Sequence, residues 1–330
     1  MEIKRYYDPL QFDVPAPLNT TGTGTLSDAN RTYYNKNLIK LAGPYLVHDQ
    51  FAQQKPLPLN NSKTVEFHGF KPLEKALKPL TEGVTPQGQT LERFVVTAKI
   101  KQYGDYVALS DLLRFTDVDP MVLEAQETIA DQAGRTLDTV TREVINAGTN
   151  VQYADGTVSS RSALAEGNVL TVKAVKIAVR ALKKQNAPRI NGNYVAIINP
   201  DVAYDLSEDQ EYKDQIKYTD ASTFKNGFLY KLSGVEFYES TEAKIFAKAG
   251  SGSRDVYSTL IVGRGAYGVT KLEGHGLETI IKQLGSAGSA DPLDQRSTVG
   301  WKAAKAAAIL VDQYMVRVET CSHFNDQKAN

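Results

Sequence analysis

Two stretches in the first third of the chain alternate between apolar and polar residues, which is the pattern of β-strands. Val65 and Phe67 alternate with polar neighbours, and residues 94–101 (FVVTAKIK) alternate in the same way. Between them, residues 72–90 (PLEKALKPLTEGVTPQGQT) contain three prolines, two glycines and charges of both signs. This segment is too long for a hairpin turn and too polar to form a core. It therefore predicts an extended loop that acts outside the compact body.

The strongest helical pattern spans residues 119–148. Asp119 suits the N-cap, Pro120 suits the first helical position, and Gly148 suits the end of the helix. Apolar residues recur between these ends at spacings of three and four: Val122, Ala125, Ile129, Ala133, Leu137, Val140 and Val144. This spacing predicts a long helix whose apolar stripe lies on a sheet. Asp138 is expected to face solvent.

The second half of the chain mixes helices with strands. Thr171 is expected to cap a helix, residues 194–198 form a buried strand, and Pro200 opens a short helix. Further strands are predicted at 234–239, 256–262, 267–272 and 277–283. In the last run, 299–320, the alanines of WKAAKAAAIL favour helix, whereas the alternation of Tyr314, Val316 and Val318 favours strand. The boundary between the two stays open.

Residues 1–62 show little periodicity and many prolines, but they keep more aromatic residues than a solvated tail usually does. An arm that lies against another surface fits this composition. The opening residues lack an apolar signal core, and no stretch approaches 18 apolar residues, so we expect synthesis in the cytoplasm and no membrane span. Cys321 is the only cysteine, which excludes an intrachain disulfide and a thiolate cluster. It is expected to be a small buried residue at a strand end.

The charges argue against a protein that grips DNA over its whole surface. Lys+Arg and Asp+Glu are both 38, so there is no surplus of cations to neutralise phosphates. Lysines 75, 78, 99 and 101 flank the extended loop and could contact DNA, but pairing with carboxylates of a neighbouring subunit is equally plausible. Six charged residues are the candidate intersubunit contacts: Glu74, Lys75, Lys78, Glu82, Glu92 and Arg93.

One motif suggests a cofactor. Gly263, Gly265 and Gly268 spell G-x-G-x-x-G after an apolar strand, where a dinucleotide fingerprint would lie. That chemistry needs a helix next, whose N-terminus holds the pyrophosphate. The residues that follow, YGVTKLEGHG, are strand-like, so a glycine-rich turn is the better interpretation. The four histidines are scattered and no catalytic motif occurs. We therefore expect no enzymatic activity, no cofactor and no metal.

The order of elements resembles the major capsid proteins of tailed bacteriophages with the Hong Kong 97 fold, and more narrowly the N4-like major capsid protein family. The segments that carry the resemblance are 94–112 (FVVTAKIKQYGDYVALSDL), 193–206 (NYVAIINPDVAYDL), 260–269 (LIVGRGAYGV), 291–310 (DPLDQRSTVGWKAAKAAAIL) and 314–320 (YMVRVET). None of them is a catalytic signature, so the resemblance depends on their number and order.

This resemblance implies an α+β capsid fold with defined parts. They are an N-terminal arm at 1–62, a two-stranded extended loop at 63–103, a peripheral domain at 104–168 with the spine helix 119–148, an axial domain at 169–305, and a return strand with a C-terminal tail at 306–330. The axial domain would lie near the five-fold and six-fold axes of a shell.

The resemblance also implies a function. The chain would assemble with itself into pentamers and hexamers of an icosahedral phage head, and would enclose double-stranded DNA without sequence-specific binding. Scaffolding and portal proteins are expected partners, and decoration proteins are a further candidate. The protein would be located in the virion after synthesis in the host cytoplasm. A shell protein of a bacterial nanocompartment is the alternative, and a nucleotide-binding oxidoreductase is a weaker one.

Overall fold

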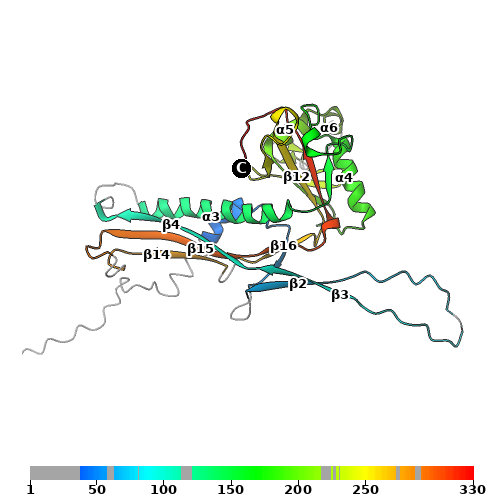
Figure 1. The fold of residues 1–330 in the computed structure, drawn as a ribbon, viewed down its shortest axis with the longest axis horizontal. Coiled ribbons are helices and arrows are strands. Elements are labelled where there is room, and N and C mark those ends of the chain that lie inside the picture. The colour runs from blue at the N-terminus through cyan, green and yellow to red at the C-terminus, as the bar shows by residue number, and fades with distance from the viewer. Residues whose placement is uncertain are drawn as a thin grey trace, which may run out of the picture.

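The computed structural model describes residues 38–57, 63–80, 82–112, 121–216, 224–225, 228–229, 231–272, 276–286 and 291–330. An elongated base carries a compact body near one end, and a long loop projects beyond it (Figure 1). The predicted α+β class is confirmed. The predicted cap at Asp119 and Pro120 lies outside the described residues, as does the arm before residue 38.

The base consists of one long helix on a three-stranded antiparallel sheet. Helix α3 spans Met121–Ile145, and the sheet has the order β14-β15-β4 (Figure 1). These strands span Leu277–Lys282, Arg296–Lys305 and Lys101–Ser110. The apolar stripe of α3 and the inner face of the sheet form one buried cluster, to which Ile129, Ala133, Leu137, Leu277, Val299, Trp301 and Ala303 belong.

The predicted stripe is confirmed at its centre, whereas Val140 and Val144 are only partly buried. The prediction that Asp138 faces solvent is wrong, because its side chain is fully buried against the N-terminal segment around His48. An apolar repeat reveals the face that meets the sheet. It does not reveal that a second segment covers the neighbouring face of the same helix.

The alanine-rich run of 301–310 is strand. Residues up to Lys305 belong to β15, which pairs along its whole length with β4 and along six residues with β14. Pairing on both edges thus overrides the helical preference of alanine. It also places β14 and β15 on the spine helix. This grouping differs from the expectation that 169–305 form one domain, because β14 and β15 pair with β4 and not with the sheet of the compact body.

The compact body is built on a seven-stranded mixed sheet, in which the path β5-β17-β12-β6-β10-β9 is joined by β11 at β12. In that order the strands span Val151–Tyr153, Met315–Thr320, Val256–Val262, Tyr194–Ile198, Val235–Glu239 and Lys231–Leu232, with β11 at Ile245–Phe246. The predicted strands at 194–198, 234–239 and 256–262 are confirmed within a residue.

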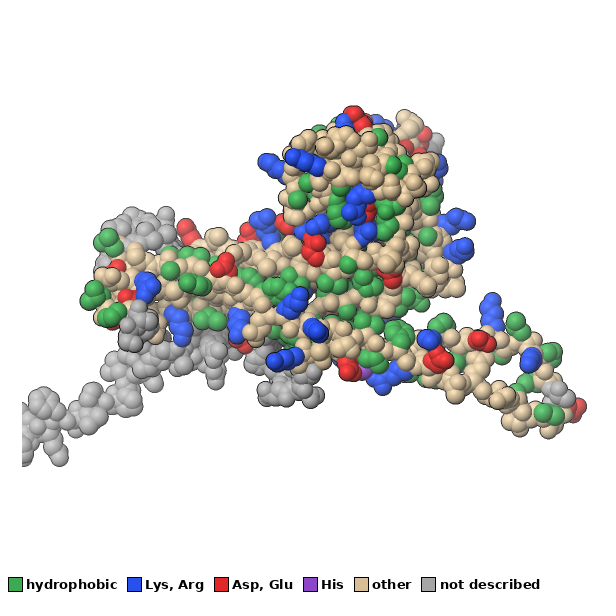
Figure 2. Space-filling model, in the orientation of Figure 1, with side chains coloured by type: hydrophobic (Ala, Val, Ile, Leu, Met, Phe, Trp, Pro, Cys, Tyr) green, Lys and Arg blue, Asp and Glu red, His purple; other side chains and the backbone are tan. Residues whose placement is uncertain are grey.

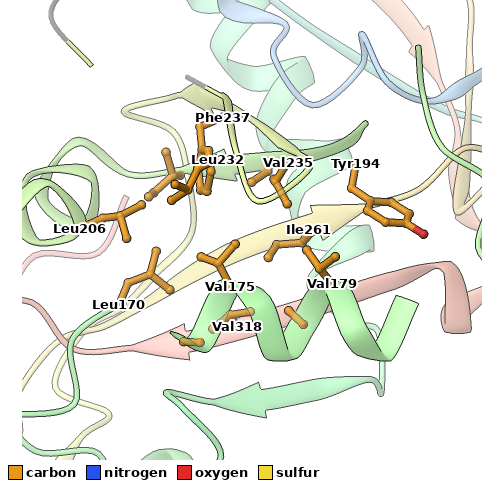
Figure 3. Packing of buried hydrophobic residues seen from close by; sticks show 14 of the residues in the cluster. Leu170, Val175, Val179, Tyr194, Leu206, Leu232, Val235, Phe237, Ile261 and Val318 are labelled. Atoms are coloured by element: carbon orange, nitrogen blue, oxygen red, sulfur yellow. The ribbon is translucent and has the colours of Figure 1, made fainter. Parts of the chain in front are cut away.

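Helices α4 (Val172–Lys184), α5 (Pro200–Glu208) and α6 (Gln210–Ile216) belong to the same body. The Thr171 hydroxyl accepts from the Ala174 amide, and the Asn199 side chain caps α5 just before Pro200, so both predicted helix starts are confirmed. Figure 3 shows Val175 and Val179 of α4 pointing at Ile261 and Val318 of the sheet. The opposite face, with Val195 and Leu260, packs towards the end of α3 at Ile145.

Short elements connect base and body. Strands β1 (Gln53–Lys55), β13 (Tyr267–Thr270) and β16 (Ala307–Ile309) form a three-stranded sheet, and β2 (Thr64–Phe70) pairs with β3 (Arg93–Lys99). A two-residue pair joins β7 (Phe224–Lys225) to β8 (Phe228–Leu229). Single turns of 3-10 helix occur at Gly43–Tyr45, Arg161–Ala163, Ser251–Ser253 and Asp312–Tyr314.

The helix–sheet contact of the base predicts a stability effect. Leu137 is fully buried between α3 and the sheet, so Leu137→Ala leaves a cavity and should lower the free energy of unfolding by about 2–5 kcal/mol. Urea titration of the purified chain measures this loss. Glu127→Ala, on the exposed side of the same helix, is the control and should change stability little. Equal losses in both variants would contradict the assigned face.

Candidate assembly surfaces

The extended loop carries apolar side chains that no described part of its own chain covers. Between β2 and β3, the described residues of 71–92 run along two extended arms away from the body (Figure 1). Leu77 is 82% exposed and Leu80 is 77% exposed, and Leu73, Val84 and Leu91 are also exposed. Burial of such side chains stabilises each by about 1.5–3 kcal/mol, so the loop as it stands leaves this energy unused.

Polar contacts hold the two arms of the loop together near its base. Lys71 Nζ lies 2.7 Å from a Glu92 carboxylate oxygen, and the Lys71 amide donates to the Glu92 carbonyl at 2.9 Å. The hydrogen bond from Lys71 holds the pKa of the Glu92 carboxyl below its ordinary value. Further out, Gln89 Nε2 donates to the Glu74 carbonyl at 2.9 Å. The loop is thus shaped by its own backbone and side chains and not by packing against the body.

The six candidate contact residues all lie on this loop or at its base, and all are exposed. Five belong to the arms, and Arg93 opens β3. Glu92 pairs with Lys71 of its own chain, which sequence reasoning did not anticipate because the two residues are 21 positions apart. Glu74, Lys75, Lys78 and Glu82 lie in the outer part of the loop, where their charged groups face solvent.

A second apolar surface lies on the outer face of the β14-β15-β4 sheet. Trp301 and Ala303 point to α3, so the residues that alternate with them point away from it. On that side is an open groove of about 520 Å³, between Tyr106, Ile280 and the strand around Gly300. Tyr106 is 68% exposed and Ile280 is 40% exposed. A Cβ on Gly300 would lie 2.8 Å from Tyr106 Cβ, so glycine is what lets the tyrosine lie across the strand.

Sequence reasoning missed this groove, because no strand was predicted directly after residue 101 and the alanine-rich run was left open between helix and strand. The two glycines of the groove, Gly104 and Gly300, were the available signal, since glycine inside a strand often marks close approach of another backbone. Figure 2 shows apolar side chains both along the base and along the extended loop.

A buried ion pair joins the N-terminal segment to the spine helix and to β15. Lys305 Nζ lies 2.6 Å from Asp49 Oδ2 and donates to the Leu137 carbonyl at 2.7 Å. The Thr141 hydroxyl donates to Asp49 Oδ1 at 2.6 Å. The lysine side chain is fully buried, and that of Asp49 is 9% exposed. Each charge therefore depends on the other, because a buried charge without a partner is strongly destabilising.

His48 extends the same network on the neighbouring turn of the helix. Its amide donates to Asp138 Oδ1 at 2.8 Å, and its Nδ1 lies 2.6 Å from Asp138 Oδ2. A carboxylate only accepts hydrogen bonds, so Nδ1 carries the proton. The Tyr267 hydroxyl donates to the His48 carbonyl, and complete burial raises the pKa of that hydroxyl well above its ordinary value. These residues close the space between α3, β13 and the N-terminal segment.

The glycine motif is a strand connection. The amide of Gly263 donates to the Tyr314 carbonyl, and the amide of Arg264 donates to the Pro188 carbonyl. Strand β13 follows directly, as the sequence predicted. A Cβ on Gly268 would lie 2.5 Å from the ring of Phe67, so this glycine allows the base of the extended loop to approach β13. The backbone amides that would cradle a pyrophosphate are therefore used within the fold.

The other candidate groups for chemistry are placed structurally. Cys321 is fully buried directly after β17, as expected, and burial raises the pKa of its thiol to about 11. His323 lies beside Asp205, and His275 lies outside the described residues. In the part of the chain that the structure describes, no three His, Cys, Asp or Glu side chains gather as metal ligands, and no helix has the length and hydropathy to cross a bilayer.

Comparison with known proteins agrees with a shell subunit. The structure is similar to the capsid of Cyanophage Pam1, with a TM-score of 0.64 and 14% identity over 86% of this chain and 93% of that chain. It is also similar to the capsid of Cyanophage P-SCSP1u, with a TM-score of 0.62 and 12% identity over 82% and 87% of the two chains. The encapsulin of Synechococcus elongatus matches at a TM-score of 0.53 and 9% identity over 85% and 88%.

The fold is therefore the Hong Kong 97-type capsid fold, as the order of elements predicted. Residues 94–318, more than half of the chain, match the model of the phage capsid protein family, and the chain belongs to that family. A search of curated proteins finds no significant match. The protein is a major capsid protein, a structural subunit and not an enzyme, which assembles with itself into a shell.

The buried ion pair predicts the second stability effect. Lys305→Met leaves Asp49 buried without its cation and should lower the free energy of unfolding by about 3–5 kcal/mol, measured by urea titration. The control is Lys302→Met, an exposed position on the same strand. Combining Lys305→Met with Asp49→Leu should recover much of the loss, because an apolar pair can replace a buried ion pair. If Lys305→Met and Lys302→Met behave alike, the pair does not hold the N-terminal segment.

Proposed function

We propose that this chain is the major capsid protein of a tailed phage of the N4-like group, and that it forms the pentamers and hexamers of an icosahedral head around double-stranded DNA. The observation that carries the proposal is the extended loop, whose exposed apolar side chains are not covered by any other described residues of the chain. Ordering a loop of this length in a monomer would cost conformational entropy without burial to offset it. A neighbouring subunit supplies that burial in a shell.

The extended loop and the groove on the outer sheet face are the two halves of one contact. The loop offers Leu77 and Leu80, and the groove between Tyr106 and Ile280 is apolar and open. Each subunit gives its loop to one neighbour and receives the loop of another. Such a head-to-tail contact between different surfaces closes into rings when the rotation between subunits allows it. Pentamers and hexamers are rings of this kind.

The charged residues of the loop set the register of this contact. Glu74, Lys75, Lys78 and Glu82 place charges of both signs along the outer part of the loop and pair with charges on the neighbouring subunit, while Glu92 and Arg93 act at the base of the loop. Exposed ion pairs contribute at most about 1 kcal/mol each. Apolar burial therefore supplies most of the affinity, and the charges favour one alignment.

The remaining parts take their roles from the same architecture. Residues 169 to about 271, which supply most of the compact body, are the axial domain near the symmetry axes, and the spine helix with its sheet is the peripheral domain. The part of the arm around His48 and Asp49 packs on α3 of its own chain, and contact with neighbouring subunits is proposed for the part of the arm outside the described residues. Scaffolding and portal proteins guide assembly of chains made in the host cytoplasm, and decoration proteins are further candidates. Packaged DNA contacts the shell without sequence preference.

The second candidate function is the shell of a bacterial nanocompartment, and the similarity to an encapsulin supports it. Purified particles decide between the two. A phage head contains double-stranded DNA that nuclease cannot reach, whereas a nanocompartment contains a protein cargo. Particles that hold one cargo protein and no DNA would overturn the phage proposal.

Replacing residues 74–88 with a short Gly/Ser link tests the contact. We expect an unchanged circular dichroism spectrum, because none of these residues belongs to a buried cluster among the described residues. Sedimentation should give monomers or isolated capsomers where the unaltered chain gives shells. Normal shells would contradict the assigned role of the loop, and a misfolded chain would contradict the architecture.

Point variants separate the two parts of the contact. Leu77→Ser with Leu80→Ser should impair assembly strongly, and Lys75→Gln with Lys78→Gln should impair it weakly. Tyr106→Ser, on the receiving face, should resemble the leucine variants. Light scattering of each purified chain during assembly measures the difference. The opposite order would indicate a contact governed by charge.

A further inference from the structure

The exposed side of α4 is cationic along its whole length. Lys173, Lys176, Arg180, Lys183 and Lys184 are all exposed, and the helix carries no acidic residue. The opposite side, with Val175 and Val179, is buried on the sheet. A chain with equal numbers of cations and anions does not produce such a face by composition alone.

The two halves of this face differ in their partners. Lys173 pairs with Asp155 at 2.9 Å, and Lys176 pairs with Glu211, so the N-terminal half is neutralised within the chain. No carboxylate among the described residues pairs with Arg180, Lys183 or Lys184. Cations near a helix C-terminus interact favourably with the helix dipole, by about 0.3–1 kcal/mol each. This interaction explains in part why Lys183 and Lys184 lie in the last turn of α4.

The dipole does not account for the cations that other segments add beside them. Arg189 follows α4 by five residues and is exposed. Arg264 lies in the connection between β12 and β13, is exposed, and has its amide bonded to the Pro188 carbonyl at 2.8 Å, which places it beside Arg189. We call Arg180, Lys183, Lys184, Arg189 and Arg264 the cationic ridge. Figure 2 shows blue side chains at the edge of the compact body where Figure 1 places α4.

The composition of the ridge indicates its partner. The described exposed large apolar residues include none between positions 172 and 193 and none between 263 and 266. Protein–protein contacts have an apolar centre and are poor in lysine, whereas contacts with the phosphates of nucleic acid use lysine and arginine without an apolar centre. The extended loop and the groove fit a protein neighbour, and the cationic ridge fits a polyanion.

We infer that the cationic ridge faces the interior of the shell and contacts the phosphates of packaged DNA, without sequence preference. This inference rests on the proposed function and assigns a DNA-facing side to the subunit. Contact with phosphates depends on charge and distance and not on base sequence, which suits five long side chains on one surface. A carboxylate-rich surface of a neighbouring protein is the competing partner and becomes an outcome of the test.

Lysine labelling of assembled particles tests the inference. DNA-filled and empty particles of the same chain are treated with a small amine-acetylating reagent, and each lysine is quantified by mass spectrometry. We expect Lys183 and Lys184 to react several-fold less in filled than in empty particles. The control residues Lys248 and Lys328 are exposed, and Asp255 accepts from the amides of Lys248 and Gln327, which places both lysines along the C-terminal segment. The C-terminus lies on the side of the compact body opposite α4 in Figure 1, so both lysines should react equally in filled and empty particles.

Any other labelling result overturns the inference. Protection of Lys183 and Lys184 in both kinds of particle would mean that a protein surface covers the ridge. Full reaction in both would place the ridge on the outside. Equal protection of the control lysines would mean that DNA only slows the reagent. Particles that hold no DNA at all would instead contradict the proposed function, so the two failures are distinguishable.

A pair of matched variants tests whether the ridge holds the genome. Lys183→Gln with Lys184→Gln removes two ridge charges, and Lys248→Gln with Lys328→Gln removes two charges elsewhere on the body. We expect both chains to form filled particles, and the ridge variant to release its DNA at a lower temperature, followed by a DNA-binding dye during heating. Equal release temperatures, or failure of the ridge variant alone to form shells, would overturn the inference.

Discussion

The buried pair between Asp49 and Lys305 is the constraint on which the arrangement of the base depends. Lys305 ends β15 and lies opposite Lys101, the first residue of β4, so the pair is located where the extended loop joins the sheet. Asp49 brings the N-terminal segment to the same point, and the contacts of its neighbour His48 to Asp138 prevent that segment from sliding along α3. Three parts of the chain that are far apart in sequence thus meet at one buried polar site.

In this arrangement the base of the extended loop is packed and its outer part is exposed. Val65, Phe67 and Ala98 of the loop strands pack with Ala306 next to the ion pair, and Gly268 admits the Phe67 ring against β13. Beyond Phe70, the described residues of the loop form hydrogen bonds only with one another, so the direction of the loop is set at its base and its surface stays exposed. This combination suits a subunit that contacts several neighbours. The packed base fixes the direction of the loop, and the exposed outer part can adapt to the surface of the partner.

The elements with a regular period could be predicted from the sequence, and the contacts between distant segments could not. The centre of the α3 stripe, the strand at 194–198, the cap at Thr171 and the helix start at Pro200 depend on neighbouring residues and are confirmed. Asp138 was misplaced because its partner, His48, is 90 positions away. The alanine-rich run was left open because its strand character comes from pairing with β4, whose own role was hidden by the loop. The groove on the outer sheet face is lined by β4 and β15, so it could not be predicted while neither strand was assigned.

The net charge of the chain likewise does not reveal how the fold arranges the charges. A count of 38 cations and 38 anions argues against a surface that attracts DNA as a whole. The fold distributes these charges unevenly, with acidic residues on α5 and α6 and unpaired cations at the end of α4. A shell subunit presents each face to a different neighbour, so the charge of each face determines what it can bind. The average over the chain therefore constrains solubility, whereas the arrangement of the charges by the fold determines which face can attract a polyanion.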